Sequence, residues 1–362
     1  METLLQIPGL KSVLYILLAV GIFGALITIH EFGHYITARI CGVTVREFAL
    51  GMGPQIFSRV SKKTGIRYSV RLLLIGGYVS MDGEDGDSEN PNAFCNKNIW
   101  QRILIIVAGA GMNILLGFIA MFILTTGTVL STDGALLPTN VIAGFTEGST
   151  SNLSGEHGLM ENDRVVVVNG VPVFTGYDLV YEITNSAYEP VDMIVVRGDN
   201  FVKLEDVQFP TTEESGIVFG SYDFKVYGKT PNIINLGLYS VNRSFSTVKM
   251  VYDSLFDLIR GRYGAEAVSG PVGTTQVIGE AAQAGGGTLL YLVAIITINL
   301  GVFNLLPVPA LDGGRLLFLL IELFRGKPIN RNFEGYVHFI GILVLFALMA
   351  LISIKDIIGL LK

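Results

Sequence analysis

The sequence predicts a polytopic α-helical membrane protein with four transmembrane helices, a β-hairpin that re-enters the membrane, and an inserted extracytoplasmic α+β domain. Half of its 362 residues are apolar and 15% are charged, a balance outside that of ordinary soluble domains. Four stretches contain no Asp, Glu, Lys or Arg, and each approaches or exceeds the ~20 residues needed to cross a bilayer. These stretches are Ser12–Ile29, Ile103–Thr132, Ala281–Leu311 and Gly335–Ile354.

The first stretch is expected to stay in the membrane, because no small-residue cleavage site follows it. Positive charges then predict the orientation, since loops rich in Lys and Arg remain in the cytoplasm. They gather between the first two stretches and again after the third, which places the long 133–230 segment outside, together with the N-terminus. The cations are Arg39, Arg46, Arg59, Lys62, Lys63, Arg67, Arg71 and Lys97, then Arg315, Arg325, Lys327 and Arg331.

Residues 1–132 therefore hold the first two spans and, at about 53–82, a region of β character. Gln55–Val60 and Ile66–Leu72 flank a polar turn, as in a β-hairpin. The run Leu73–Val79 follows and is too apolar for a cytoplasmic loop, yet too short to cross the membrane. We expect it to dip into the membrane beside protein, where its backbone groups find partners.

Residues 133–230 have the composition of a small soluble domain with short β-rich runs, Arg164–Val168 and Met193–Arg197 among them. Asn169-Gly170 predicts a tight turn between two strands. Residues 231–280 form a linker with an amphipathic helix at Ser240–Gly261, whose apolar residues recur at spacings of three and four. Residues 281–362 complete the chain with the third and fourth spans.

A metal site is predicted at the end of the first span by the pattern His-Glu-x-x-His. His30 and His34 are four residues apart, so a helix presents both imidazoles on one face, as ligands of one ion require. Glu31 lies beside them and can take a proton from a water that the metal activates. Ionisable residues at the end of an uncharged span are costly, and a metal offsets that cost.

Asp312 is the best candidate for a third ligand. It ends the uncharged stretch Ala281–Leu311, and the segment Asn304–Gly314 interrupts a helix at membrane depth with two prolines and two glycines. A carboxylate at that depth needs a cation. The remaining two histidines are not expected to bind the metal. We expect His157 to be a solvated loop residue and His338 to pack or hydrogen-bond between helices.

His30-Glu31-Phe32-Gly33-His34 and the segment Asn304–Gly314 together resemble the site-2 protease family of intramembrane metalloproteases, in particular the bacterial type that cleaves anti-sigma factors. The resemblance covers nearly the whole chain, and Gly76–Glu84 is similar to the family's re-entrant β-loop. It implies Zn²⁺ held by His30, His34 and Asp312, with Glu31 as the general base.

The same resemblance implies that Asn304 orients the substrate or steadies the oxyanion, and that Gly76, Gly77 and Tyr78 contact the substrate. Ala108–Asn113 is similar to the family's AGPxxN motif, with Ala110 where proline is usual. The 133–230 segment resembles a PDZ domain through Gly158–Val165, in which Asn162 replaces the usual glycine.

The expected partners are the lipid bilayer and single-span membrane proteins, such as anti-sigma factors or signal-peptide remnants. The expected location is a bacterial plasma membrane, and the net charge of −6 gives no reason to expect a nucleic-acid partner. Cys41 and Cys95 both fall on the predicted cytoplasmic side, which argues against a disulfide.

Two alternatives remain open. A transporter would also carry intramembrane carboxylates and histidines, but no inverted repeat relates the halves of this chain. A catalytically silent PDZ scaffold would tolerate loss of a ligand or of Glu31, and neither is lost.

Overall fold

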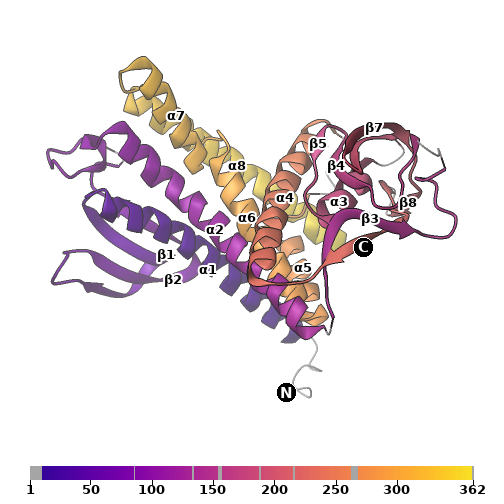
Figure 1. Ribbon diagram of the computed structural model, residues 1–362. Helices are drawn as coiled ribbons and strands as arrows, with labels where there is room; N and C mark the ends of the chain where they lie inside the picture. The colour runs from indigo at the N-terminus through magenta and orange to yellow at the C-terminus, as the bar shows by residue number, and fades with distance from the viewer. Residues whose placement is uncertain are drawn as a thin grey trace. The chain divides into compact units, whose positions relative to one another are not determined.

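The computed structural model describes residues 10–84, 86–132, 134–153, 157–186, 189–214, 217–261 and 268–360. Its chain divides into two compact units, one made of residues 1–120 and 248–362 and the other of residues 121–247 (Figure 1). Four helices in the described residues are long and apolar enough to cross a membrane. The helices are α1 (Leu10–Ile40), α2 (Ile99–Ser131), α6 (Gly286–Leu305) and α8 (Arg331–Leu360).

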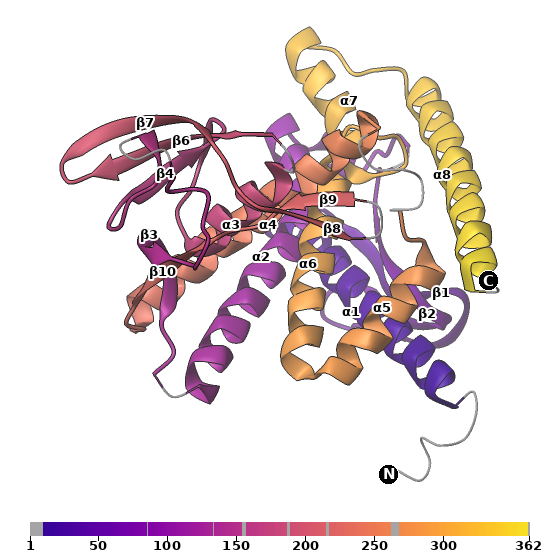
Figure 2. The same cartoon turned by 90° about the vertical axis from the view of Figure 1, so that its right-hand side faces the viewer.

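The four spans predicted from uncharged stretches are thus confirmed, although their bounds differ. The first helix continues past Ile29 to Ile40 and carries His30 and His34 inside it. The third stretch, Ala281–Leu311, is divided among three elements. Its start belongs to α5 (Pro271–Ala284), its centre is α6, and its end is the connection to α7 (Asp312–Arg325). Figure 2 shows α5 and α6 as neighbours, joined at Gly285, which has a positive φ of 122°.

The helices of the first unit approach closely where glycines face their neighbours. A Cβ on Gly117 of α2 would lie 2.3 Å from the Ile298 side chain, and one on Gly301 of α6 would lie 2.9 Å from the Ala110 carbonyl oxygen. Ala110 occupies the proline position of the motif without interrupting α2. At the end of this unit that carries α7, Arg102 of α2 pairs with Glu322 of α7 at 2.5 Å.

The β-region of the first unit consists of two long strands, β1 (Val45–Val60) and β2 (Arg67–Met81). Residues of β1 from Glu47 to Leu50 each have two partners in β2, one from Gly77–Ser80 and one from Arg67–Val70. Phe57–Val60 pairs with Arg67–Val70 as well. Both strands therefore fold back on themselves, β1 around Gly51–Pro54 and β2 around Leu73–Gly76, and four short segments form the sheet.

The predicted hairpin is therefore found at the expected position, but each of its strands is longer than predicted and folds back on itself. The segment Gln55–Val60 is the second half of a strand that begins at Val45, and Leu73–Val79 is part of β2. The sheet packs along α1, where a Cβ on Gly24 would lie 2.5 Å from the Leu74 carbonyl oxygen. This glycine lets the strand lie against the helix backbone.

The second unit is built on a sheet in the order β10-β3-β4-β6-β7, with β5 paired to β4. Helix α3 (Gly176–Ser186) covers it (Figure 2), and Leu179 and Ile183 are fully buried in the shared core. The strands are β3 (Leu137–Phe145), β4 (Arg164–Val168), β5 (Val171–Pro172), β6 (Val191–Arg197), β7 (Asn200–Val207) and β10 (Phe224–Lys229). A separate hairpin pairs β8 (Thr211–Glu214) with β9 (Ile217–Gly220).

Two sequence features of this unit have direct structural explanations. Asn169 and Gly170 both have positive φ, 48° and 81°, as the predicted tight turn between β4 and β5 requires. Asn162 also has a positive φ, of 70°, so it stands at a position that favours glycine and uses the residue type that tolerates it next best.

The amphipathic helix predicted at Ser240–Gly261 is longer than expected. Helix α4 runs from Ile233 to Ile259, so its first two turns precede the predicted start. Cys41 and Cys95 are both free thiols, in agreement with the absence of a disulfide.

Candidate metal centre

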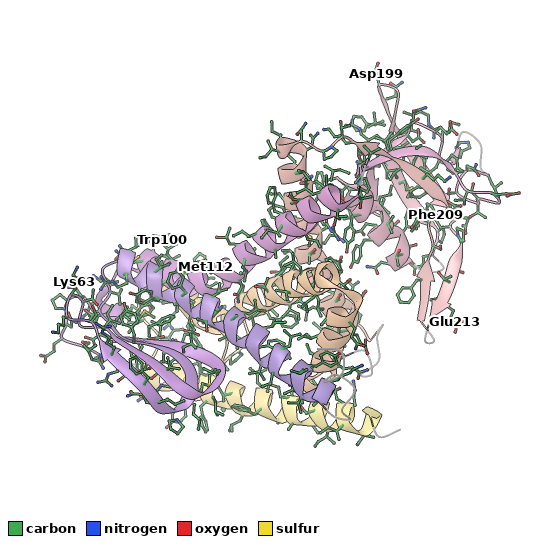
Figure 3. The ribbon with its side chains drawn as sticks, turned by 90° about the horizontal axis from the view of Figure 1, so that it is seen from below. Lys63, Trp100, Met112, Asp199, Phe209 and Glu213 are labelled. Atoms are coloured by element: carbon green, nitrogen blue, oxygen red, sulfur yellow. The ribbon has the colours of Figure 1, made fainter. Side chains whose placement is uncertain are left out.

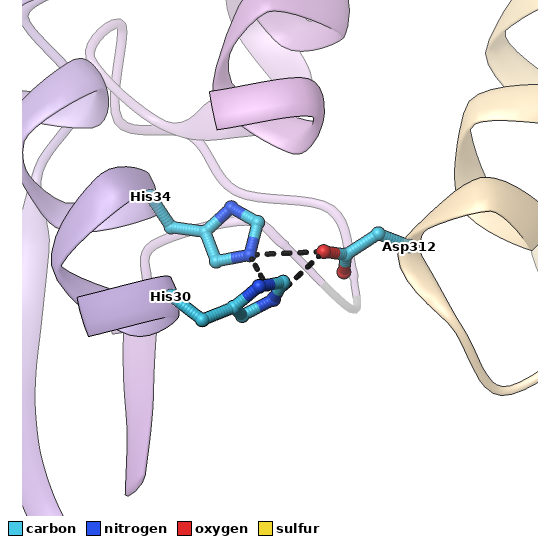
Figure 4. Close-up of side chains that lie close together, drawn as sticks. All are labelled: His30, His34 and Asp312. Atoms are coloured by element: carbon cyan, nitrogen blue, oxygen red, sulfur yellow. Dashed lines mark hydrogen bonds and ion pairs between the residues drawn. The ribbon is translucent and has the colours of Figure 1, made fainter. Parts of the chain in front are cut away.

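Three side chains from two helices meet at one point in the first unit (Figure 4). His30 and His34 lie on one face of α1, with their Nε2 atoms 3.2 Å apart. Asp312, the first residue of α7, places Oδ2 3.0 Å from His30 Nε2 and 3.1 Å from His34 Nε2. Both histidines are buried. The three ligand atoms predicted from the sequence are therefore brought together.

The size of this triangle fits a zinc ion. Four ligands placed tetrahedrally at 2.0 Å from zinc are separated by about 3.3 Å. The three measured separations, 3.0, 3.1 and 3.2 Å, lie close to that edge length. Zinc accepts two imidazoles and a carboxylate, and a set of three protein ligands leaves the fourth position open for chemistry.

The hydrogen bond on the far side of His34 supports the same assignment. His34 Nδ1 lies 2.8 Å from the Ile105 carbonyl oxygen in α2, so Nδ1 carries the proton and donates it. A neutral imidazole protonated there presents a lone pair at Nε2. Two lone pairs and a carboxylate that converge on one point repel one another unless a cation lies between them. A backbone carbonyl is also a usual hydrogen-bond partner of a metal-binding histidine.

Two glycines make room for the imidazoles. A Cβ on Gly109 of α2 would lie 2.3 Å from His34 Nε2 and 2.9 Å from His30 Cε1. A Cβ on Gly33 of α1 would lie 2.3 Å from the Ala108 carbonyl oxygen. Helices α1 and α2 therefore touch backbone to backbone beside the site, and any larger residue at Gly109 would fill the space of the ligands.

Glu31 faces the β-sheet. Its Oε2 accepts a hydrogen bond of 3.1 Å from the backbone N–H of Val79 in β2. Gly77, two residues earlier, passes so near that a Cβ there would lie 3.6 Å from Glu31 Cγ. The carboxylate next to the two histidines is thus oriented by the strand and stays outside the ligand set.

The segment that presents Asp312 is held by helix α8. Ala310 has a positive φ of 76°, unusual for alanine, and its N–H donates to His338 Nδ1 at 3.0 Å. Gly341, on the same helix, lets α8 approach the turn, because a Cβ there would lie 2.5 Å from Pro309 Cβ. His338 therefore bonds between elements, as expected, and its partner is the segment that precedes Asp312.

The other residues predicted to contact substrate occupy different places. Gly77 lies beside Glu31, whereas Gly76 has a positive φ of 96° at the fold-back of β2, against the Met52 side chain. The Tyr78 hydroxyl accepts a hydrogen bond from Arg71. Asn304 lies in the last turn of α6, ahead of the loop that carries Asp312. Of this group, Gly77 is the one that the structure joins to Glu31.

Arg71 itself is neutralised within the sheet. Its guanidinium lies 3.0 Å from Glu47 Oε1. Burial alone would raise the pKa of Glu47, but hydrogen bonds from Ser69 and Arg71 hold that pKa below its ordinary value. Glu47 is therefore a carboxylate at neutral pH, and this pair adds no net charge to the sheet.

Comparison with known proteins places the chain in a family. The profile of peptidase family M50 matches residues 18–348. A protein of Clostridium acetobutylicum, whose name provisionally calls it a zinc metalloprotease, is 35% identical over 95% of this chain and 97% of its own length. The zinc metalloprotease RasP of Bacillus licheniformis is 31% identical, covering 93% of this chain and 97% of that protein. The regulator of sigma-W protease RasP of Bacillus subtilis is 29% identical, over 93% and 96%.

Proposed function

The chain belongs to peptidase family M50 and is a zinc metalloprotease of the membrane, and from this premise we propose that His30, His34 and Asp312 hold its zinc ion. The observation that carries the proposal is the triangle of ligand atoms between α1 and α7, with the Glu31 carboxylate beside it. The reaction is hydrolysis of peptide bonds within transmembrane segments, as in site-2 proteases that act in regulated intramembrane proteolysis.

The residues have separate tasks. Zinc, when bound, supplies Lewis-acid chemistry that polarises a carbonyl group and makes a water molecule more acidic. Glu31 takes the proton of the attacking water and passes it to the leaving amine, because its carboxylate adjoins the ligands without binding in their place. Asn304 orients the substrate chain or steadies the oxyanion from the end of α6.

The β1–β2 sheet is the proposed substrate platform. Its fold-back end lies beside Gly24, far along α1 from Ile40, and carries exposed apolar side chains such as Leu72 and Leu73. We place this end in the membrane as the re-entrant region. A transmembrane helix shields its peptide bonds, so it must unwind, and the outer edge at Gly77–Met81 can take up the freed backbone groups as an added strand.

The second unit contains the segment 133–230, which we assign as a PDZ-like domain on the extracytoplasmic side. The assignment rests on the sheet covered by α3 and on the Gly158–Val165 segment, whose Asp163 is fully buried and pairs with Arg197 at 2.7 Å. The cations between the first two spans support the orientation. The substrates are single-span proteins, anti-sigma factors or signal-peptide remnants, in a bacterial plasma membrane.

One experiment tests the function. The full-length protein is co-expressed with a panel of tagged single-span substrates, alongside a Glu31→Gln control, and cleavage is followed by immunoblotting. Cleavage within the membrane segment by the unaltered protein alone supports the proposal. If Glu31→Gln cleaves equally well, the assignment of the base is wrong.

A further inference from the structure

The β1–β2 sheet has two ends of opposite character. At one end Val45 pairs with Met81 and Val60 pairs with Arg67, and the Ser61–Ile66 turn lies there. At the other end Met52 pairs with Leu73, and both strands fold back. Five exposed apolar side chains belong to the fold-back end, whereas the exposed cations, together with Val60 and Tyr68, belong to the end with the turn. The apolar set is Met52, Ile56, Leu72, Leu73 and Leu74.

Four cations at the turn have no acidic partner among the described residues. Arg59, Lys62, Lys63 and Arg67 are all exposed, and the sequence from Phe48 to Met81 contains no Asp or Glu. The two other cations of this region are already matched, since Arg71 pairs with Glu47 and Arg46 pairs with Asp82 at 2.6 Å. We call the four unmatched residues the basic turn.

The position of the basic turn along the axis of α1 is fixed by contacts with that helix. Tyr68, next to Arg67, hydrogen-bonds through its hydroxyl to Tyr35 in the last turns of α1, at 2.7 Å. The opposite end of the sheet lies against Gly24, about 24 Å along α1 from Ile40 at 1.5 Å per residue. Figure 3 shows Lys63 at the same end of this unit as Trp100, an exposed tryptophan at the start of α2. Tryptophan in that position is typical of headgroup depth.

We propose that the basic turn binds the phosphate groups of anionic lipids in the leaflet that it faces. The inference rests on the proposed insertion of the sheet, and it adds a lipid ligand that fixes the sheet's depth. Anionic headgroups match four unneutralised cations next to an apolar surface, and each cation near such a surface adds to the attraction. An acidic substrate segment is the competing occupant. It fits less well, because it has no apolar part that could contact the fold-back end of the same sheet.

The test uses full-length protein with Cys41→Ser, Cys95→Ser and a fluorophore on Thr64→Cys, in vesicles of phosphatidylcholine with or without phosphatidylglycerol. Quenching by headgroup-labelled lipid should rise with the phosphatidylglycerol fraction and fall as salt is added. Replacing all four residues of the basic turn with Gln should abolish this rise. The matched control replaces four exposed cations of the second unit with Gln, namely Arg164, Lys203, Lys225 and Lys229, and should keep it.

The proposal would be refuted if quenching did not depend on the phosphatidylglycerol fraction, or if it still rose with that fraction after the four substitutions. If the substitutions instead weaken cleavage of substrates with acidic flanks while the lipid response is unchanged, the surface binds peptide. Activity in detergent separates this test from the proposed function, because a loss of headgroup binding leaves the zinc site and its hydrolysis in detergent intact.

A second observation concerns the buried side chain of Asn113 in α2. This residue is 0% exposed, and its Nδ2 lies 3.4 Å from His30 Nδ1. Its Oδ1 is buried without a hydrogen-bond partner among the described residues. Its backbone oxygen accepts a hydrogen bond of 3.1 Å from the Thr297 hydroxyl of α6, which holds this part of α2 in place.

A half-turn of the Asn113 amide exchanges the positions of its oxygen and nitrogen. The oxygen then faces His30 Nδ1 and accepts a hydrogen bond from its N–H, which leaves the Nε2 lone pair for a metal. His34 already has this arrangement with the Ile105 carbonyl oxygen. We infer that Asn113 is the positioning residue of His30, its amide oxygen holding the ring in the metal-binding tautomer.

The experiment measures zinc affinity by competition with a chelator in the full-length protein. Asn113→Leu, of similar size but without an acceptor, should bind zinc on the order of 10- to 100-fold more weakly. Asn113→Asp keeps an acceptor and should restore most of the affinity. Leu115→Ala, at an exposed position of the same helix, is the control.

Thermal unfolding of the zinc-free variants separates positioning from stability. Asn113 is a positioning residue if the Leu and Asp variants unfold alike yet differ in zinc affinity. Unchanged affinity in Asn113→Leu, or an equal loss in both variants, would show that the amide does not position His30.

Discussion

The backbone N–H of Val79 donates a hydrogen bond to the Glu31 carboxylate at 3.1 Å. Val79 pairs with Phe48 in the sheet, and the bond to Glu31 means that its N–H points to the outer edge, away from β1. The proposed base and the proposed substrate edge therefore share one donor. A substrate strand that takes this donor would release the carboxylate at the moment when the peptide arrives.

Glu31→Gln should retain zinc and lose activity. Glutamine has nearly the same shape and can still accept the Val79 bond, but it cannot take a proton. Turnover should fall on the order of 10²- to 10⁴-fold, the usual contribution of general-base catalysis. Elemental analysis and a cleavage assay on the same preparation measure both quantities. Zinc loss in this variant would instead make Glu31 a ligand.

Removal of a ligand should lower the zinc content as well as the activity. His34→Ala and Asp312→Ala each leave two of the three protein ligands, so the zinc content should fall well below one ion per chain and activity should fall with it. His157→Ala is the matched control, because His157 is exposed in the second unit. Full zinc content and activity in either ligand variant would contradict the assignment.

Gly109→Ala should weaken zinc binding without any change in charge. The added methyl group would lie 2.3 Å from His34 Nε2, so a ring or a helix must shift. Zinc affinity should fall on the order of tenfold or more, as it does when the orientation of a ligand is disturbed. Gly111→Ala is the control, since a Cβ there meets nothing within 4 Å. Equal affinities in the two variants would show that the helices adjust freely.

The four spans and the three converging ligands could be predicted because each leaves a local mark. Uncharged stretches show the spans, the spacing of His30 and His34 shows one helix face, and Asp312 stands out at the end of an uncharged run. The spacing cannot show that Asp312 reaches both histidines, since that depends on the break between α6 and α7.

The features that the sequence does not predict depend on contacts between distant segments. Gly109 and Asn113 belong to the segment that is similar to the AGPxxN motif, but only the packing of α2 beside α1 shows that they border the two histidines. The fold-back of β1 and β2 was also missed, because an almost wholly apolar run lacks the alternation that shows which residues pair. The early start of α4 at Ile233 was missed although Ile234, Leu238 and Val241 continue the spacing of three and four towards Phe245.

The last prediction concerns how a helical substrate becomes cleavable. Unwinding inside lipid leaves amide groups unpaired at several kcal/mol each, so something must replace their bonds. Pairing of β2 with β1 stops at Leu73 and resumes at Gly77. The outer edge of the segment from Gly77 to Met81 lies beside Glu31 and is the proposed replacement.

Val79→Pro removes the outward donor of this edge, whereas Val79→Ala removes side-chain bulk and keeps the N–H. Both variants should bind zinc, and only the proline variant should lose turnover. If the edge binds substrate, KM rises in Val79→Pro; if the donor serves only to orient Glu31, kcat falls at constant KM. Helix-breaking residues in the substrate should speed cleavage in the unaltered protein. Strand addition would be excluded if Val79→Pro kept full turnover and if the cleavage rate did not depend on the helicity of the substrate. Neither the donor nor the unwinding step would then limit the reaction.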